Sequence, residues 1–204
     1  MTESPSEAPA RPTPDEVAAR FADVAGAITF NAEHATPKIH VSADDWVEAH
    51  RALKEHLPFF SYLAAVDWSA DVAVGEPPEG DEVEERYEVV TRLSDVEEGI
   101  GLIVSTAVPR ERPVLPTLTG VFAGADWHER EAAEMFGIDF DGHPNLVKLY
   151  LPDGFEGHPL RKSFPLLSRQ VKPWPGSVDV EDMPSVENPE APSAEGSEEE
   201  GEPE

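Results

Sequence analysis

Apolar residues near the start of the chain recur at the spacing of an amphipathic helix. The sequence Thr-Pro-Asp-Glu at 13–16 combines an N-cap, a proline at the first helical position and a glutamate at the third. These signals predict a helix over residues 14–25, ended by Gly26. The i, i+4, i+7 spacing predicts that its buried stripe contains Val17, Phe21 and Val24.

The next pattern changes from short strands to a second helix. Strand signals occur at 28–30 and 38–41. Ser42 can cap a helix over 43–56, which Pro58 would stop. We expect this helix to pack on a sheet through one face, formed by Trp46, Ala49 and Leu53.

Three apolar runs, rich in branched and aromatic residues, predict longer strands at 59–68, 87–93 and 100–108. The link between the last two is too short for a parallel crossover, so they should form an antiparallel hairpin. The predicted fold class is therefore α+β, with a small antiparallel or mixed sheet and helices packed on it.

The prolines between 109 and 116 should break any regular element. A helix of about ten residues, 127–136, follows. Asp126 would cap it, with Glu129 completing a capping box and Gly137 as its left-handed C-cap. Two Gly-His-Pro turns come next, at 142–144 and 157–159.

Charge divides the chain into a folded part and acidic segments. The 204 residues contain 42 acidic and 15 basic residues, a net charge of -27, and fit one domain with tails. Segment 71–85 has 7 acidic residues and segment 179–204 has 11, both without Lys or Arg. The expected organisation is a disordered segment 1–13, an α+β domain 14–156 with an acidic loop 71–85, an extended partner-binding arm 157–178 and a disordered acidic tail 179–204.

Composition excludes several functional classes. The folded part remains acidic, which disfavours nucleic acid as a partner. The sequence contains no cysteine, so it offers no ligands for a conventional iron–sulfur cluster or a cysteine-bound zinc. No stretch approaches the roughly 20 apolar residues of a membrane span, and no signal peptide is recognisable, so we expect a soluble chain in the cytoplasm.

The helix over 127–136 gathers most of the candidate chemistry. Arg130 and Glu134 can form an i, i+4 surface ion pair. A metal or acid–base site from His128, Glu129, Glu131 and Glu134 is the alternative, but a zincin pattern needs a second histidine where Ala132 stands.

The remaining motifs favour structure over catalysis. His143 and His158 stand between Gly and Pro, a context that suits an imidazole capping a backbone carbonyl. No glycine-rich phosphate loop is present, so NADH and flavin have no recognisable site in this chain. The expected cofactor content of the chain itself is therefore none.

Two blocks of sequence resemble a known family. Residues 125–144 contain Glu-Arg-Glu, two variable residues, an acid, two apolar residues and then Gly-His-Pro, and residues 157–165 read Gly-His-Pro-Leu-Arg-Lys-Ser-Phe-Pro. This arrangement resembles the signature and the ending of the complex I 30-kilodalton subunit family, whose bacterial members are the C subunits of NADH:quinone oxidoreductase. The strong resemblance covers about forty residues.

The resemblance implies a quinone-module scaffold protein with no redox centre of its own, bound peripherally at the cytoplasmic face of the plasma membrane. Its implied partners are the large quinone-site protein of the complex, its D subunit, and the cluster-bearing B and I subunits. FMN, iron–sulfur clusters and quinone would belong to those partners.

The resemblance also marks residues for a structural or interface role. Glu129 to Glu131 would fix the signature helix, while Arg161 and Lys162 would anchor the arm, with Arg161 paired to another chain. The complete set is Glu129, Arg130, Glu131, Glu134, Phe136, Gly137, Gly142, His143, Pro144, His158, Pro159, Arg161 and Lys162.

Two alternatives remain open from the sequence. The same type of protein could serve a related membrane complex fed by ferredoxin, coenzyme F420 or a hydrogenase. A chain of another class, a free-standing acidic interaction protein, would also fit the composition.

Overall fold

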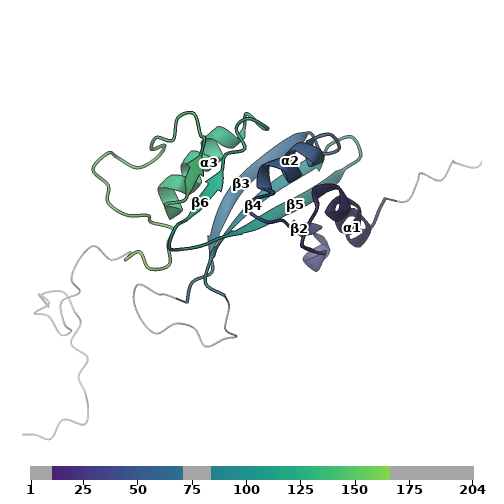
Figure 1. Cartoon of the computed structure of the whole chain (residues 1–204), viewed down its shortest axis with the longest axis horizontal. Coiled ribbons are helices and arrows are strands. Elements are labelled where there is room, and N and C mark those ends of the chain that lie inside the picture. Colours follow the sequence, from purple (N-terminus) through teal and green to yellow (C-terminus); the bar gives the residue numbers. More distant parts are fainter. Residues whose placement is uncertain (1–10, 71–83, 166–204) are drawn as a thin grey trace, which may run out of the picture. The chain divides into compact units, whose positions relative to one another are not determined.

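Helices and strands follow one another in an α+β arrangement, as predicted (Figure 1). The computed structural model describes residues 11–70 and 84–165, so most of the acidic loop, much of the arm and all of the acidic tail lie outside the described residues. The elements are α1 (Pro14–Ala25), β1 (Thr29–Asn31), η1 (Glu33–Ala35), β2 (Lys38–His40), α2 (Trp46–Lys54), β3 (Phe59–Asp67), β4 (Tyr87–Asp95), β5 (Ile100–Val108), β6 (Val114–Pro116), α3 (Ala125–Phe136) and β7 (Asp139–Asp141).

The main sheet has five strands in the order β1-β2-β5-β4-β3. All neighbours pair antiparallel except β2 and β5, which are parallel, so the sheet is mixed. The predicted hairpin of β4 and β5 is confirmed over its full length, from Tyr87↔Val108 to Asp95↔Ile100.

Helix α1 begins and ends where its capping signals predict. The Thr13 hydroxyl accepts from the Glu16 amide, the Glu16 carboxylate accepts from the Thr13 amide, and Gly26 adopts the left-handed conformation at φ 63°. Val17 and Phe21 are buried, but Val24 is 36% exposed, so that part of the predicted stripe is wrong. The small residues Ala18, Ala22 and Ala25 fill the interface in its place.

Helix α2 is shorter than predicted, although its buried face is confirmed. The Ser42 hydroxyl accepts from the Asp45 amide and so caps a turn that precedes the helix rather than the helix itself. Trp46 and Leu53 are fully buried, and Ala49 nearly so. The helix ends at Lys54, before Pro58 is reached.

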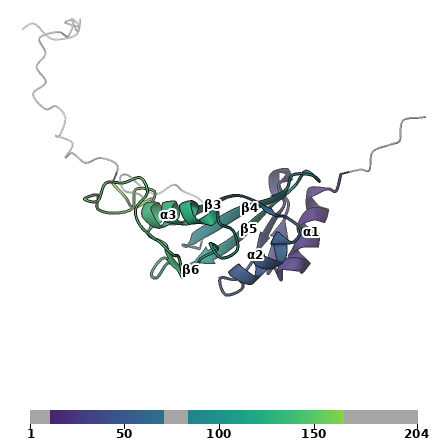
Figure 2. The same ribbon diagram turned by 90° about the horizontal axis from the view of Figure 1, so that it is seen from above.

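All three helices bury side chains in one core on the same face of the sheet. Alternate residues of the central strands point there, among them Leu63, Val89 and Val104. Both views show α1 and α2 toward one end of the sheet and α3, with β6, toward the other (Figures 1 and 2).

The prediction that prolines break all regular structure between 109 and 116 is wrong. Strand β6 runs through Pro116 and pairs parallel with β7, with Leu115 opposite Phe140. The pairing survives because the flanking bonds use other groups: the Asp139 amide donates to the Pro113 carbonyl, and the Thr117 amide to the Asp141 carbonyl. Proline is tolerated on a strand that pairs along one edge only.

Candidate functional site

Helix α3 starts two residues earlier than predicted, and its capping box is not formed. Gly124 is the N-cap, without a side-chain bond, and Asp126 lies within the first turn. Glu129 turns away from the helix end. Its carboxylate accepts from the Thr117 hydroxyl (2.5 Å) and the Leu118 amide (2.6 Å), so it ties α3 to the segment after β6.

Glu129 is fully buried in this position. Burial disfavours the charged carboxylate and raises its pKa, although the bonds from Thr117 and Leu118 act in the opposite direction. The His143 Nε2 atom lies 3.9 Å from the carboxylate and 3.5 Å from the Asp126 carboxylate. The cluster therefore joins α3 to two other segments of the chain.

His143 has the capping role that its Gly-His-Pro context predicts. Its Nδ1 accepts from the Asn145 amide (3.0 Å), which leaves the proton on Nε2. Nε2 then donates to the Asp126 carbonyl at 3.2 Å. The preceding Gly142 has φ 80°, a conformation that favours glycine.

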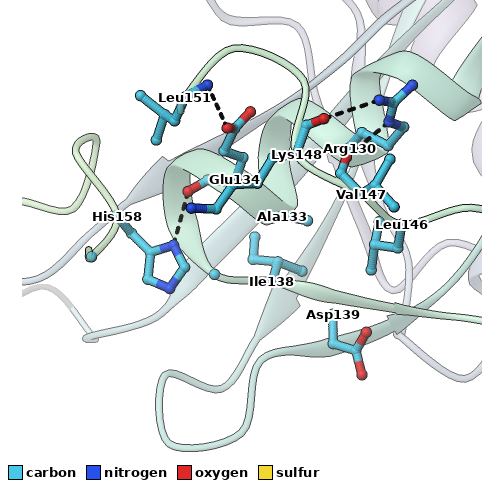
Figure 3. A pocket seen from close by; sticks show the side chains of 12 residues that line it. Arg130, Ala133, Glu134, Ile138, Asp139, Leu146, Val147, Lys148, Leu151 and His158 are labelled. Carbon is cyan, nitrogen blue, oxygen red and sulfur yellow. Dashed lines mark hydrogen bonds between the residues drawn. The ribbon is translucent and has the colours of Figure 1, made fainter. Parts of the chain in front are cut away.

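Glu134 and Arg130 do not form the predicted ion pair; each bonds the following loop instead (Figure 3). Arg130 donates to the carbonyls of Val147 (2.9 Å) and Lys148 (3.1 Å). The Glu134 carboxylate accepts from three consecutive backbone amides, at 2.6–2.9 Å, those of Leu149, Tyr150 and Leu151. One helix face thus binds both donors and acceptors of the same loop.

The environment of Glu134 favours its charged form. Burial opposes the charge, but the three amides and the nearby Lys148 outweigh burial and hold the pKa of Glu134 below its usual value. Only 7% of Glu134 is exposed. The surface position that the predicted ion pair implied for this carboxylate is therefore wrong.

Lys148 closes the same loop on itself. Its ammonium donates to the carbonyls of Pro152, Asp153 and Phe155 at 3.0–3.2 Å. Between this loop and α3 lies an open cavity of about 320 Å³, shown in Figure 3, with an apolar floor from Ala133, Ile138, Leu146 and Leu151.

The second Gly-His-Pro turn caps the carboxyl end of α3. The His158 Nδ1 atom lies 2.8 Å from the Glu134 carbonyl, and the Leu160 amide donates to the Met135 carbonyl. Gly137, at φ 72°, is required here, because a Cβ would collide with the side chains of His158 and Arg161. These bonds satisfy carbonyls that a helix end leaves without partners.

Arg161, which the sequence analysis expects to pair with another chain, has contacts within its own domain. Its Nε donates to the Phe136 carbonyl at 2.6 Å, and its guanidinium lies 5.6 Å from the centre of the Tyr87 ring. Phe136 contacts that ring too, at 6.2 Å between centroids. The fold brings the carboxyl end of α3 to the Arg161 side chain, a proximity that the sequence pattern does not indicate.

Lys162 also bonds its own domain. Its amide donates to the Asp67 carboxylate and its ammonium to the Ser69 carbonyl, both at 3.0 Å. Burial of Asp67 opposes its charge, but the amides of Lys162 and Ser69 outweigh it and lower its pKa. Residues 157–165 of the predicted arm thus contact α3 and the end of β3, and the remainder of the arm lies outside the described residues.

The carboxylates of α3 do not converge on one point, because Glu129 faces Thr117 and Glu134 faces the loop after Val147. In the described ranges 11–70 and 84–165, no group of three potential metal ligands comes together. The same residues include no helix long and apolar enough to cross a membrane.

The sequence analysis missed three residues that form the hydrogen bonds of this site. Asp67, Thr117 and Lys148 each bond a segment distant in sequence or close a loop, and no periodic pattern marks them. Of the remaining signature residues, Glu131 is half-buried beside Leu63 and Phe136, while Pro144 and Pro159 stand in the two turns.

The fold and the site define a small α+β domain whose last helix is tied by its polar side chains to the chain that follows. The chain belongs to the family described as respiratory-chain NADH dehydrogenase, 30 Kd subunit, which matches residues 39–170.

Named relatives agree with this assignment. The NADH-quinone oxidoreductase C subunit of Roseiflexus sp. (strain RS-1) is 43% identical over 137 residues, covering 65% of this chain and 72% of the relative. The C 2 subunit of Rhizobium meliloti (strain 1021) is 37% identical, covering 75% and 80%. The fused C/D subunit of Methylococcus capsulatus is 41% identical over 95 residues, or 47% of this chain; the match spans only 16% of that longer protein.

Solved structures share the fold. A trypsin-resistant fragment of Nqo5 aligns with a TM-score of 0.52 and 25% identity, over 65% of this chain and 99% of the fragment. A chain of the membrane-bound sulfane sulfur reductase, an archaeal respiratory membrane complex, aligns with a TM-score of 0.61 and 24% identity, over 75% and 86%. The latter likeness concerns the fold alone.

Proposed function

We propose that this chain is the C subunit of a proton-translocating NADH:quinone oxidoreductase, acting as a scaffold of its quinone module. Family membership is the observation that carries the proposal. The fused C/D relatives support a D-type protein as the immediate partner, because fusion joins the two in one polypeptide. The B and I subunits would be the other neighbours, at the cytoplasmic face of the membrane.

The proposed role is mechanical. The polar signature side chains bond their own chain: Glu129 and Glu134 accept hydrogen bonds, while Arg130 and Arg161 donate to backbone carbonyls. Such contacts fix a shape that a partner can bind, and they place no group opposite a substrate. Electron transfer from NADH through FMN and iron–sulfur clusters to quinone would take place in the partner subunits.

The test is purification of the tagged full chain from its native membranes, with its companions identified by mass spectrometry. We expect a D-type protein, iron–sulfur proteins and a flavin-bearing NADH-input protein in one assembly. A monomer lacking these companions would contradict the proposal and favour a free-standing interaction protein.

A related membrane complex with another electron donor is the second candidate, because the fold also occurs in a chain of an archaeal respiratory membrane complex. Ferredoxin, F420 or a hydrogenase module could feed such a complex. The same purification distinguishes the two, because only the first would contain the flavin-bearing NADH-input protein.

Arg130 provides a sharper test of the scaffold role. Arg130→Glu should release the loop carbonyls of Val147 and Lys148 and reduce the amount of assembled complex. The complex that does assemble should keep a near-normal quinone reductase rate per flavin. Full assembly with the rate abolished would instead place Arg130 in the chemistry. Arg51→Glu, the same charge reversal at an exposed position of α2, is the matched control.

A further inference from the structure

The face of the main sheet opposite the helices presents apolar side chains to solvent. Strand pairing places Ala64 beside Val90 and Val66 beside Glu88, so alternate residues form rows across this face. In the described part of the chain, the helices bury their apolar residues against the other face. The apolar side chains of this outer sheet face are Tyr62, Ala64, Val66, Val90, Ile103 and Ala107.

Several apolar side chains of this face are exposed to solvent. Val66 is 38% exposed, and Trp68, which continues the same alternation, is also 38% exposed. Ala64 is exposed as well. Ala64, Val66 and Trp68 thus give this face exposed apolar area beside polar residues, as protein contact sites have.

The charge of the outer sheet face is opposite to that of the protein. Its rows contain three basic residues, Lys38, Arg86 and Arg92, and one acidic residue, Glu88, in a chain of net charge -27. The Glu84 carboxylate, just before β4, is the other acid beside the face. Basic groups still outnumber acidic ones.

Part of this positive charge has no partner in the described chain. Glu88 is buried and accepts from Lys38 (2.6 Å) and Trp68 (2.8 Å), so its charge is balanced within the face. Arg92 makes no hydrogen bond or ion pair to the described residues. Its guanidinium lies against Gly101, where a side chain would displace it.

The outer sheet face also has a hollow of about 310 Å³ over β2, β4 and β5. Its lining combines the basic side chains of Lys38 and Arg86 with Glu84 and Glu88, and Lys38 is paired with Glu88. Ammonium and guanidinium groups form their strongest hydrogen bonds with carboxylates. Arg86, at the edge of this hollow, can therefore bind an acidic side chain of an incoming protein.

We infer that the outer sheet face is the docking surface of a partner protein that presents carboxylates around an apolar strip. A second copy of this chain fits poorly, because two such faces would bring like charges together. The acidic tail 179–204 supplies charge but has almost no large apolar residue to cover Tyr62 and Val66. A separate chain meets both requirements, and the inference does not depend on the electron donor proposed above.

The first experiment is site-specific photo-cross-linking in the tagged full chain, within native membranes. A benzophenone amino acid replaces Ala64 or Ala107, and a control replaces Arg51 on the opposite, helical side. We expect both sheet positions, but not position 51, to cross-link the same acidic, apolar-containing peptide of another protein. Cross-links to residues 179–204 or to a second copy would overturn the inference. The same benzophenone at the exposed Leu160 tests another surface of the chain, and a cross-link from position 160 with none from positions 64 and 107 would also overturn the inference.

The second experiment tests charge complementarity. Arg92→Glu should reduce the cross-link yield from position 64 at least tenfold, and Arg92→Gln less, whereas Arg51→Glu should leave it unchanged. Raising salt should weaken the unsubstituted contact, which needs no variant that could misfold. Equal yields from Arg92→Glu and Arg51→Glu, together with no salt effect, would exclude an electrostatic docking surface.

Discussion

The two ends of the domain are held together by different forces. At the α1–α2 end, Phe21, Trp46 and Leu53 are buried side chains of an apolar core. At the α3 end, Glu129 and Glu134 are buried as well, but each holds a segment through hydrogen bonds to backbone amides. Apolar burial is non-directional, whereas these bonds depend on particular atoms.

This difference concerns more than stability. Segments 142–151 and 157–162 contain little regular structure, so their backbone groups form few of the hydrogen bonds that helices and sheets provide. The side chains of α3 supply partners to their amides and carbonyls. A scaffold surface made of loops can keep one shape only if such groups are satisfied.

The largest effect should come from the apolar end. Leu53→Ala removes a fully buried side chain and should lower the free energy of unfolding by about 2–5 kcal/mol. Urea unfolding followed by circular dichroism measures it. Val47→Ala, on the same helix but only partly buried, should cost clearly less. Equal losses of unfolding free energy from the two variants would show that the stability of the α1–α2 end does not depend on the buried face of α2.

This comparison explains what the sequence could predict. Capping signals identified the three helices, and runs of branched and aromatic residues identified the three long strands, because these signals lie within each element. Helical periodicity failed at Val24, where small alanines fill the interface, and the proline rule failed at β6, whose pairing depends on β7 more than twenty residues later.

The candidate site was only partly predictable for a physical reason. The backbone-capping roles of His143 and His158 followed from their turns, because a turn is local. The partners of Glu134, Arg161 and Lys162 did not, because they depend on which loop the tertiary fold brings to each side chain. Spacing on one helix suggested an Arg130–Glu134 pair that the loop amides displaced.

His50 is the polar exception within the apolar end. It is fully buried between the Trp46 carbonyl and the Thr91 hydroxyl, and burial lowers its pKa to about 4. In the unfolded chain His50 has a pKa near 6.5 and binds the proton more tightly. The stability that neutral His50 contributes above pH 6.5 is therefore lost as pH falls toward 4. The loss should approach about 3 kcal/mol.

A His50→Gln variant isolates that contribution, because the other titrating groups are common to both proteins. The difference in unfolding free energy between native chain and variant, measured in urea from pH 7 to pH 4, should shrink as pH falls. A difference independent of pH would mean that His50 has the same pKa in the folded and the unfolded chain, which would contradict the effect of burial.

At the α3 end, Glu134→Ala removes the acceptor of three amides. We expect a loss of about 1–3 kcal/mol, the cost of leaving such groups unsatisfied, since water can reach part of the loop. Hydrogen exchange at Leu149 to Leu151 should accelerate more than exchange in β4. Glu131→Ala is the control, and uniform acceleration across the domain would contradict a local role.

The smallest effect, and the most specific, is a difference in sign between the two buried carboxylates of α3. Because burial raises the pKa of Glu129, its folded form holds the proton more tightly than the unfolded chain. Its contribution to stability is therefore full below pH 4.5 and declines as pH rises through its folded pKa. Glu134, with a lowered pKa, contributes above pH 4.5 and loses that contribution as pH falls further. Glu129→Gln should thus remove a decline above pH 4.5, whereas Glu134→Gln should remove a loss below pH 4.5. Urea unfolding at half-unit pH steps separates the two, and the same sign for both variants would show that the Thr117 and Leu118 bonds outweigh burial at Glu129.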